Sequence, residues 1–410
     1  MIQHLTEAEV DHRYQKSYPV RAGYLPRNRA SVKPSLQKLK LKADAATDFP
    51  QSTAVQEFVE VIESHPILRF YVNRMIEEVP LKHRTVENRA DLMRQLDIVT
   101  RTAPLWSTDV NDQHFFPMST LFTYMMMTTS GEAIFRDPTF NDALRPILRE
   151  WCRYLDSEES TWVINRDDGW LSPSAFAQLK LDQFVIPNER APNGGFTSYN
   201  AFFHREIKAD ARILQGADDP RAIVAPNDGT VYHTVSGAHL RSDFWLKAQP
   251  YSLADMLNGQ WLELFEGGHV FQSFLSGKDY HRWHAPVSGE VIAAQVIDGL
   301  MFSNLESEGN DIKGLGSQGY YTAVNTRGLL AIKADDPGLG VVVVVPVGIT
   351  EVSSIHHTVA KGDHVAKGQE IGSFSYGGSS LAVVFQAGAV DHFTAGPKDP
   401  IQCKQIIAMA

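Results

Sequence analysis

The sequence is poor in cysteine, and this limits the class of protein to which it can belong. Cys152 and Cys403 are the only two cysteines among 410 residues, whereas a secreted chain held together by disulfides normally carries more. Their separation also matches no spacing of metal ligands. We therefore expect a reducing compartment, the cytoplasm.

Three further absences exclude other classes. The longest apolar run lies around residues 341–347, far short of the roughly 20 residues that span a bilayer. The N-terminus lacks the basic and apolar regions of a signal peptide. The net charge is -10, and no block of Lys and Arg offers a footprint for phosphates. We expect no integral membrane segment and no nucleic-acid partner.

What the sequence does contain predicts an α+β protein. A hydrophobic content of 43% is typical of a globular chain, and 410 residues suffice for two or three domains. Residues 1–48 are polar and predict an extended N-terminal arm. Apolar residues at helical spacing predict a helical N-terminal domain over 49–190, with one helix starting at Asp137-Pro138.

Residues 191–410 predict a mainly antiparallel β domain, because glycine becomes frequent and short β-type runs dominate. The runs 329–332 and 341–345 flank Asp335-Asp336-Pro337-Gly338, a strong hairpin signal. The frame Ala-Pro-x-x-Gly-x-Val occurs at 225–231 and again at 285–291. Repeated turns of this kind suit a barrel or sandwich built from related hairpins.

The segment Gly377-Gly378-Ser379-Ser380 is a candidate for the chemical centre. The glycines permit backbone angles closed to other residues, and a hydroxyl follows at once, so an Oγ could reach the carbonyl of the Gly378-Ser379 bond. Taken alone, the segment is better explained as a glycine turn before the apolar run 381–385.

His281 and His284 are candidates for proton transfer. A separation of three places both on one face of a helix but on opposite faces of a strand. A metal site therefore requires the helical case, and no third ligand is evident. Two hydrogen-bonded structural histidines remain the alternative.

Asp228 lies in an Asp-Gly turn, which is common whatever the function. A carboxylate, a histidine and a serine are nevertheless the parts of an activated nucleophile. No Gly-x-Ser-x-Gly elbow surrounds Ser379, and no P-loop is present.

These segments together resemble the pyruvoyl-dependent phosphatidylserine decarboxylase family. The motifs that carry the resemblance appear in the family's order, and they are Phe202-Phe203-His204-Arg205-Glu206-Ile207-Lys208, Ala225-Pro226-Asn227-Asp228-Gly229, Tyr251-Ser252-Leu253, Tyr280-His281-Arg282-Trp283-His284-Ala285-Pro286-Val287, Val347-Gly348-Ile349-Thr350 and Phe374 through Ser380.

The helical half resembles the extra N-terminal domain of the soluble branch of this family, to which the fungal L-tryptophan decarboxylase of psilocybin biosynthesis belongs. Its matching segments are Val55-Gln56-Glu57-Phe58 through Ser64, Thr102-Ala103-Pro104 and Gly169-Trp170-Leu171. The resemblance implies decarboxylation of a small amino acid substrate, aromatic and tryptophan-like. Phosphatidylserine at a membrane surface is the alternative substrate.

The resemblance also implies the roles of the site residues. His284, oriented by Asp228, would deprotonate Ser379, whose Oγ would attack the Gly378 carbonyl. The precursor would separate into a β chain ending at Gly378 and an α chain that begins with a pyruvoyl group derived from Ser379. This group would be the cofactor, with no pyridoxal phosphate and no metal. His281 would transfer a proton during turnover.

Glu351 and the segment 359–372 each allow a functional and a structural interpretation. Glu351 could face a substrate ammonium, although a surface carboxylate is the favoured interpretation. The paired Lys-Gly turns within 359–372 resemble a biotinyl or lipoyl carrier lobe, but they lack the lysine motif that such a carrier needs.

Overall fold

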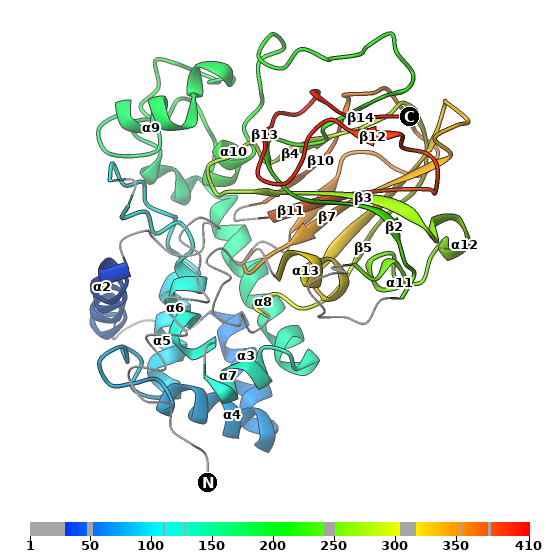
Figure 1. The fold of residues 1–410 in the computed structure, drawn as a ribbon. Coiled ribbons are helices and arrows are strands. Elements are labelled where there is room, and N and C mark those ends of the chain that lie inside the picture. The colour runs from blue at the N-terminus through cyan, green and yellow to red at the C-terminus, as the bar shows by residue number, and fades with distance from the viewer. Residues whose placement is uncertain are drawn as a thin grey trace. The chain divides into compact units, whose positions relative to one another are not determined.

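The computed structural model describes residues 29–46, 52–109, 111–126, 128–241, 251–303, 317–351, 354–375 and 379–410. The chain divides into two compact units (Figure 1). The first comprises Met1–Gln178, Ile186–Phe202 and Leu300–Leu315, and the second comprises Leu179–Val185, Phe203–Gly299 and Gly316–Ala410. The chain thus passes between the units more often than the single predicted boundary near residue 190 implies.

The first unit is helical, as the spacing of apolar residues predicted. Its helices are α2 (Val32–Ala45), α3 (Thr53–Ser64), α4 (Pro66–Glu77), α5 (Arg89–Val99), α6 (Pro117–Met126), α7 (Thr129–Ile134), α8 (Pro138–Leu155) and α9 (Pro173–Leu179), with short 3-10 turns η1 (Arg29–Ser31) and η2 (Glu158–Val163). A further 3-10 turn, η3 (Leu181–Gln183), and helix α10 (Tyr199–Phe203) follow along the chain.

Helix α8 begins where the sequence predicts it. Asp137 is its N-cap and accepts a hydrogen bond from the Phe140 amide, while Pro138 occupies the first turn, where no amide donor is needed. Helix α6 is buried from Met118 to Met126, so it has no polar face toward solvent.

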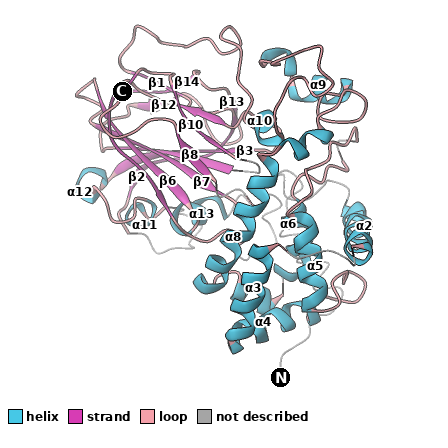
Figure 2. Cartoon of the chain, turned by 180° about the vertical axis from the view of Figure 1, so that it is seen from behind, coloured by secondary structure: helices cyan, strands magenta, loops and turns pink. Residues whose placement is uncertain are grey.

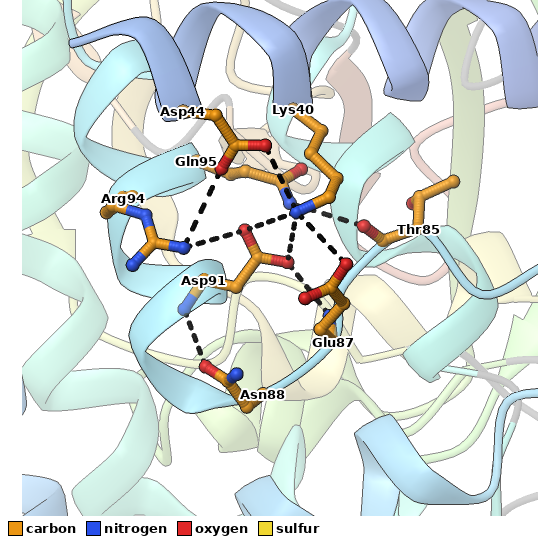
Figure 3. Close-up of polar contacts among 8 residues, drawn as sticks. All are labelled: Lys40, Asp44, Thr85, Glu87, Asn88, Asp91, Arg94 and Gln95. Carbon is orange, nitrogen blue, oxygen red and sulfur yellow. Dashed lines mark hydrogen bonds and ion pairs between the residues drawn. The ribbon is translucent and has the colours of Figure 1, made fainter. Parts of the chain in front are cut away.

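The segment expected to be an extended arm is helical over α2, so that prediction is wrong for the described part of 1–48. Lys40 of α2 lies 3.5 Å from both carboxylate oxygens of Asp91, which is fully buried on α5 (Figure 3). Asp91 also accepts from the Glu87 amide at 2.8 Å, and its own amide donates to Asn88 at 3.0 Å. The Asp91 carboxylate therefore accepts from both Lys40 of α2 and the Glu87 amide before α5, while the Asn88 side chain caps α5.

The second unit is built from antiparallel sheets, which confirms the α+β class. Its strands are β1 (Ala222–Val224), β2 (Gly229–Ala238), β3 (Gly268–Leu275), β4 (Arg282–His284), β5 (Gly289–Ile297), β6 (Arg327–Ala334), β7 (Val341–Gly348), β8 (Ile355–His357), β9 (His364–Val365), β10 (Glu370–Phe374), β11 (Ser379–Phe385), β12 (His392–Phe393), β13 (Pro400–Ile401) and β14 (Ile406–Met409). Short helices α11 (Leu253–Met256), α12 (Leu262–Phe265) and α13 (Gln318–Val324) accompany them.

Among the described residues, one sheet has eight strands in the order β13-β2-β3-β11-β7-β6-β5-β9. Two three-stranded sheets have the orders β4-β10-β8 and β1-β14-β12 (Figure 2). Strands β6 and β7 pair antiparallel, which confirms the predicted hairpin. Strand β11 pairs with β3 on one side and β7 on the other, so it lies inside the large sheet.

A buried core joins the large sheet to the β4-β10-β8 sheet. It contains Leu381 and Val383 from β11 together with Trp283, Ile371 and Phe374 from the smaller sheet. Since side chains alternate along a strand, the odd-numbered residues of β11 share the face that meets β4, β10 and β8.

Among the helices of the described residues, none combines the length and the apolar character needed to span a membrane.

We predict that Asp91→Ala lowers the free energy of unfolding by about 2 kcal/mol or more, because the substitution leaves Lys40 and the Glu87 amide without their shared acceptor. Urea unfolding would measure the change. Asp44→Ala is the matched control, since Asp44 lies 3.3 Å from the same Lys40 but is 42% exposed. That control should change the free energy by less than about 0.5 kcal/mol. Equal losses would contradict the prediction.

Candidate active site

Ser379 is the first residue of β11, and its position is fixed by pairing on both sides. It lies opposite Leu275 of β3 and Gly348 of β7 and is only 1% exposed. Gly348 has no side chain, so β7 does not cover Ser379 on that flank. Gly378, the other residue of the predicted cleavage bond, lies outside the described residues, as do Tyr376 and Gly377.

Ser379 and Ser380 face opposite sides of the sheet. Ser379 shares the face of Leu381 and Val383, which meets the β4-β10-β8 sheet. Its Oγ is buried and has no hydrogen-bond partner among the described residues. A buried hydroxyl of this kind calls for an explanation, since nearly all such groups are satisfied.

Ser380 has a different environment, because its hydroxyl is fully used on the opposite face. It accepts a hydrogen bond from Gln272 Nε2 at 2.7 Å and donates one to the Ser273 carbonyl oxygen at 3.0 Å. The structure therefore distinguishes the two adjacent serines, and only Ser379 has a hydroxyl left for chemistry among the described contacts.

The two predicted histidines come from the β4 segment of the smaller sheet. His281 immediately precedes β4, is fully buried and stacks on Phe203 with ring centroids 4.0 Å apart. Its carbonyl oxygen accepts from the Phe374 amide at the end of β10. Because β10 precedes Ser379 along the chain, His281 is hydrogen-bonded to the segment that leads to this serine.

His284 is held as a neutral imidazole with a defined tautomer. Its Nδ1 lies 2.9 Å from the Gly368 carbonyl oxygen, which can only accept, so Nδ1 carries the proton. Nε2 therefore accepts from the Tyr280 hydroxyl, 2.9 Å away. Burial lowers the pKa of His284 to about 4. The ring is therefore uncharged at neutral pH, and this is the form that can accept a proton.

Asp228 does not contact His284 in the way the resemblance implied. Its carboxylate oxygens accept from Arg212 Nε at 3.1 Å and Nη2 at 2.5 Å, and Oδ1 also accepts from the Cys403 amide at 2.8 Å. Both hydrogen bonds described for the His284 ring go elsewhere, to Tyr280 and Gly368. The expected orientation of His284 by a direct Asp228 contact is therefore corrected, although Asp228 still acts on the ring through its charge.

Strand register nevertheless brings the predicted residues to one end of the large sheet. Thr230 of β2 pairs with Phe274, and Ser379 pairs with Leu275, so the starts of β2 and β11 flank the end of β3. Asp228 comes just before β2, and His281 follows β3 by a short turn. Asp228 and His281 are therefore tied to the end of the sheet where Ser379 lies.

The structure also reveals residues that sequence reasoning missed. Thr350 has a left-handed backbone with φ of 55°, which is strained for a β-branched residue and costs about 1–3 kcal/mol. It follows Gly348 by two positions, is 3% exposed, and its Oγ1 has no hydrogen-bond partner among the described residues. The motif around Thr350 was recognised, but no pattern in it predicts a left-handed threonine.

Glu351 is 5% exposed, so the prediction that its carboxylate lies at the surface is wrong.

Metal ligation finds no support in the described part of the chain, where no group of three or more His, Cys, Asp or Glu side chains could hold an ion. His284 is in strand β4, and His281 directly precedes this strand. In an extended segment, residues three positions apart face opposite sides, so the two rings do not point to one face.

Comparison with known families identifies the class of protein. A family model described as phosphatidylserine decarboxylase matches residues 199–408, and a second model of the same description matches residues 52–179. The chain belongs to the phosphatidylserine decarboxylase family and is a carboxy-lyase.

Individual relatives narrow this class. The decarboxylase iboD of Amanita muscaria is 35% identical over 71% of this chain and 88% of its own length. The L-tryptophan decarboxylase of Psilocybe cubensis is 27% identical over 88% of both chains. A phosphatidylserine decarboxylase proenzyme of Chlamydia trachomatis is 32% identical over 55% of this chain and 73% of its own. The chain thus resembles the branch that contains fungal L-tryptophan decarboxylases.

Proposed function

We propose that this protein is a pyruvoyl-dependent decarboxylase that converts an aromatic, tryptophan-like L-amino acid to its amine and carbon dioxide after cleaving its own chain between Gly378 and Ser379. The observation that carries this proposal is the buried Ser379 hydroxyl, which has no described hydrogen-bond partner and faces the sheet that carries the histidines. Family membership supplies the class of reaction.

The cleavage requires only atoms of the chain and one water. Ser379 Oγ attacks the Gly378 carbonyl carbon, and the peptide C–N bond breaks, which leaves an ester and a free amine at residue 379. Removal of the Ser379 α-proton breaks the Cβ–Oγ bond and releases Gly378 as a carboxylate. The resulting dehydroalanine gains water and loses ammonia, so residue 379 becomes a pyruvoyl group.

The base that we assign to the first step is His284. Its neutral Nε2 has the required lone pair, and the described donor to that lone pair is Tyr280. Burial raises the pKa of Tyr280, so its hydroxyl keeps its proton and holds the imidazole in place. Proton transfer from Ser379 then requires Nε2 to exchange this hydrogen bond.

Asp228 and His281 have separate roles in this scheme. The Arg212–Asp228 pair is mostly buried and fixes the turn before β2. The Asp228 charge also favours the protonated form of His284 as the serine proton is transferred. His281, beside the end of β10, is the group that we assign to proton transfer during turnover.

The residues present fit the pyruvoyl group. It would supply a carbonyl that condenses with the substrate amine and accepts the electrons left when carbon dioxide departs. Gln272 and the Ser273 carbonyl would hold Ser380, the residue next to the pyruvoyl group. Neither pyridoxal phosphate nor a metal ion is required in this scheme.

Phosphatidylserine is a second candidate substrate, because the family models and the Chlamydia relative carry its name. The amino acid is favoured by coverage, since the Psilocybe cubensis L-tryptophan decarboxylase matches along 88% of this chain and the Chlamydia proenzyme along 55%.

Intact-mass analysis of the purified protein tests the cleavage. We expect a fragment that runs from residue 379 to residue 410 and begins with a pyruvoyl group. Ser379→Ala should abolish cleavage and activity, because the attacking oxygen is removed. Ser380→Ala keeps the Ser379 hydroxyl, so it should still cleave at the same bond, at a reduced rate. An intact wild-type chain with full activity would contradict the proposal.

Carbon dioxide release distinguishes the two substrates. We expect release from free L-tryptophan or another aromatic amino acid, and no release from phosphatidylserine in vesicles. The Ser379→Ala protein gives the background for both reactions. Turnover of phosphatidylserine alone would contradict the amino acid as substrate and favour the lipid.

The pH dependence of self-cleavage tests the role of His284. The pKa of this buried ring is lowered to about 4, compared with about 6.5 for an ordinary histidine. The basic, neutral form therefore persists as the pH falls through 6.5, and cleavage should stay constant from about pH 8 to pH 5.5 and decline only nearer pH 4. Precursor synthesised in a cell-free reaction and shifted to each pH would show this. A rate that halves near pH 6.5 would exclude His284 as the base with this pKa.

A further inference from the structure

Gln272 of β3 is a polar residue on a largely apolar face of the large sheet, which it shares with Ser380. It is fully buried and lies opposite Ala382 of β11. Its neighbours on this face of the sheet are largely aliphatic, and they include Val270, Val343, Val345 and Val384. A buried amide there costs free energy unless all its hydrogen bonds are made.

Every hydrogen-bonding group of the Gln272 amide has a partner. Nε2 donates to the Gln318 carbonyl oxygen at 3.1 Å and to Ser380 Oγ at 2.7 Å. Oε1 accepts from the Tyr251 hydroxyl at 2.7 Å. The Gln318 carbonyl can only accept, which fixes the orientation of the amide and makes Ser380 an acceptor from it.

The contact to Ser380 adds a side-chain anchor to the strand pairing that sets where Ser379 points. Ser380 also donates to the Ser273 carbonyl, so its side chain is held at two points on the α13 side of the sheet. Adjacent residues of a strand face opposite sides, and the anchored Ser380 therefore directs Ser379 toward the sheet with the histidines. A slip of one residue would exchange the two hydroxyls.

We infer that Gln272 is a positioning residue for self-cleavage and for the pyruvoyl terminus, an inference that rests on the proposed function. Before cleavage it keeps the Ser379 hydroxyl on the reactive face. After cleavage, residue 379 is a chain end, and chain ends fray unless they are tied down. The Gln272–Ser380 bond then holds the residue next to that end.

The test is the rate of self-cleavage in a cell-free synthesis reaction stopped at intervals, with fragments measured by mass. Gln272→Leu removes the donor to Ser380 and should slow cleavage about three- to tenfold, the loss of one hydrogen bond. Ser380→Ala should slow it to a similar extent, and Ser380→Thr, which keeps the hydroxyl, should restore most of the rate.

A double-mutant cycle separates positioning from general destabilisation. If Gln272 acts through Ser380, the Gln272→Leu/Ser380→Ala protein cleaves no more slowly than the slower single variant. Tyr251→Phe is a milder change, because it removes only the hydrogen bond to Gln272 Oε1. It should slow cleavage less than Gln272→Leu. Thr120→Val in α6 removes a buried hydroxyl bond in the other unit and should leave the rate unchanged even where the melting temperature falls.

The outcomes distinguish this inference from the function on which it rests. Wild-type rates in Gln272→Leu, or effects that multiply in the double variant, would overturn the positioning role while leaving self-cleavage intact. A wild-type chain that never cleaves and shows no carbonyl on labelling with phenylhydrazine would overturn both.

Discussion

The pairing of β11 with both β3 and β7 is the constraint on which the rest of the site depends. Because the strand has neighbours on two sides, its register is fixed from Ser379 to Phe385, and each side chain is assigned to one face. Two adjacent serines that are chemically equivalent in the sequence thereby become different groups. Ser380 is bound into the sheet, while Ser379 lies on the face that meets the β4-β10-β8 sheet.

Burial also determines the charge state of His284, the proposed base. His284 is kept neutral because the protein surrounding it cannot solvate a positive charge, and the Gly368 carbonyl selects the tautomer. The nearby Asp228 charge is neutralised by the bidentate Arg212. These residues therefore combine an uncharged imidazole with an ion pair, and in the proposed mechanism Asp228 would stabilise the charge-separated state that follows proton transfer.

Patterns with a local cause could be predicted from the sequence, and contacts with a distant cause could not. The Asp137 cap and the β6–β7 hairpin depend on neighbours within a few residues, and both are confirmed. The helix at 32–45 was missed because its short buried set of Val32, Leu36 and Ala43 lies among many polar residues. The Arg212–Asp228 pair and the left-handed Thr350 follow from tertiary packing, which a single sequence does not display.

The strand pairings are also compatible with the proposed cleavage of the bond before Ser379. The fragment after residue 378 carries β11, β13 and β14, which pair with β3 and β7, with β2 and with β1 respectively. The proposed cleavage would remove one covalent link at the start of β11 but none of these pairings. The new terminus would therefore be the first residue of an interior strand, and the buried Ser380 hydroxyl would anchor it one residue from the proposed pyruvoyl carbonyl. A pyruvoyl group formed there would inherit the orientation that the precursor gave to Ser379.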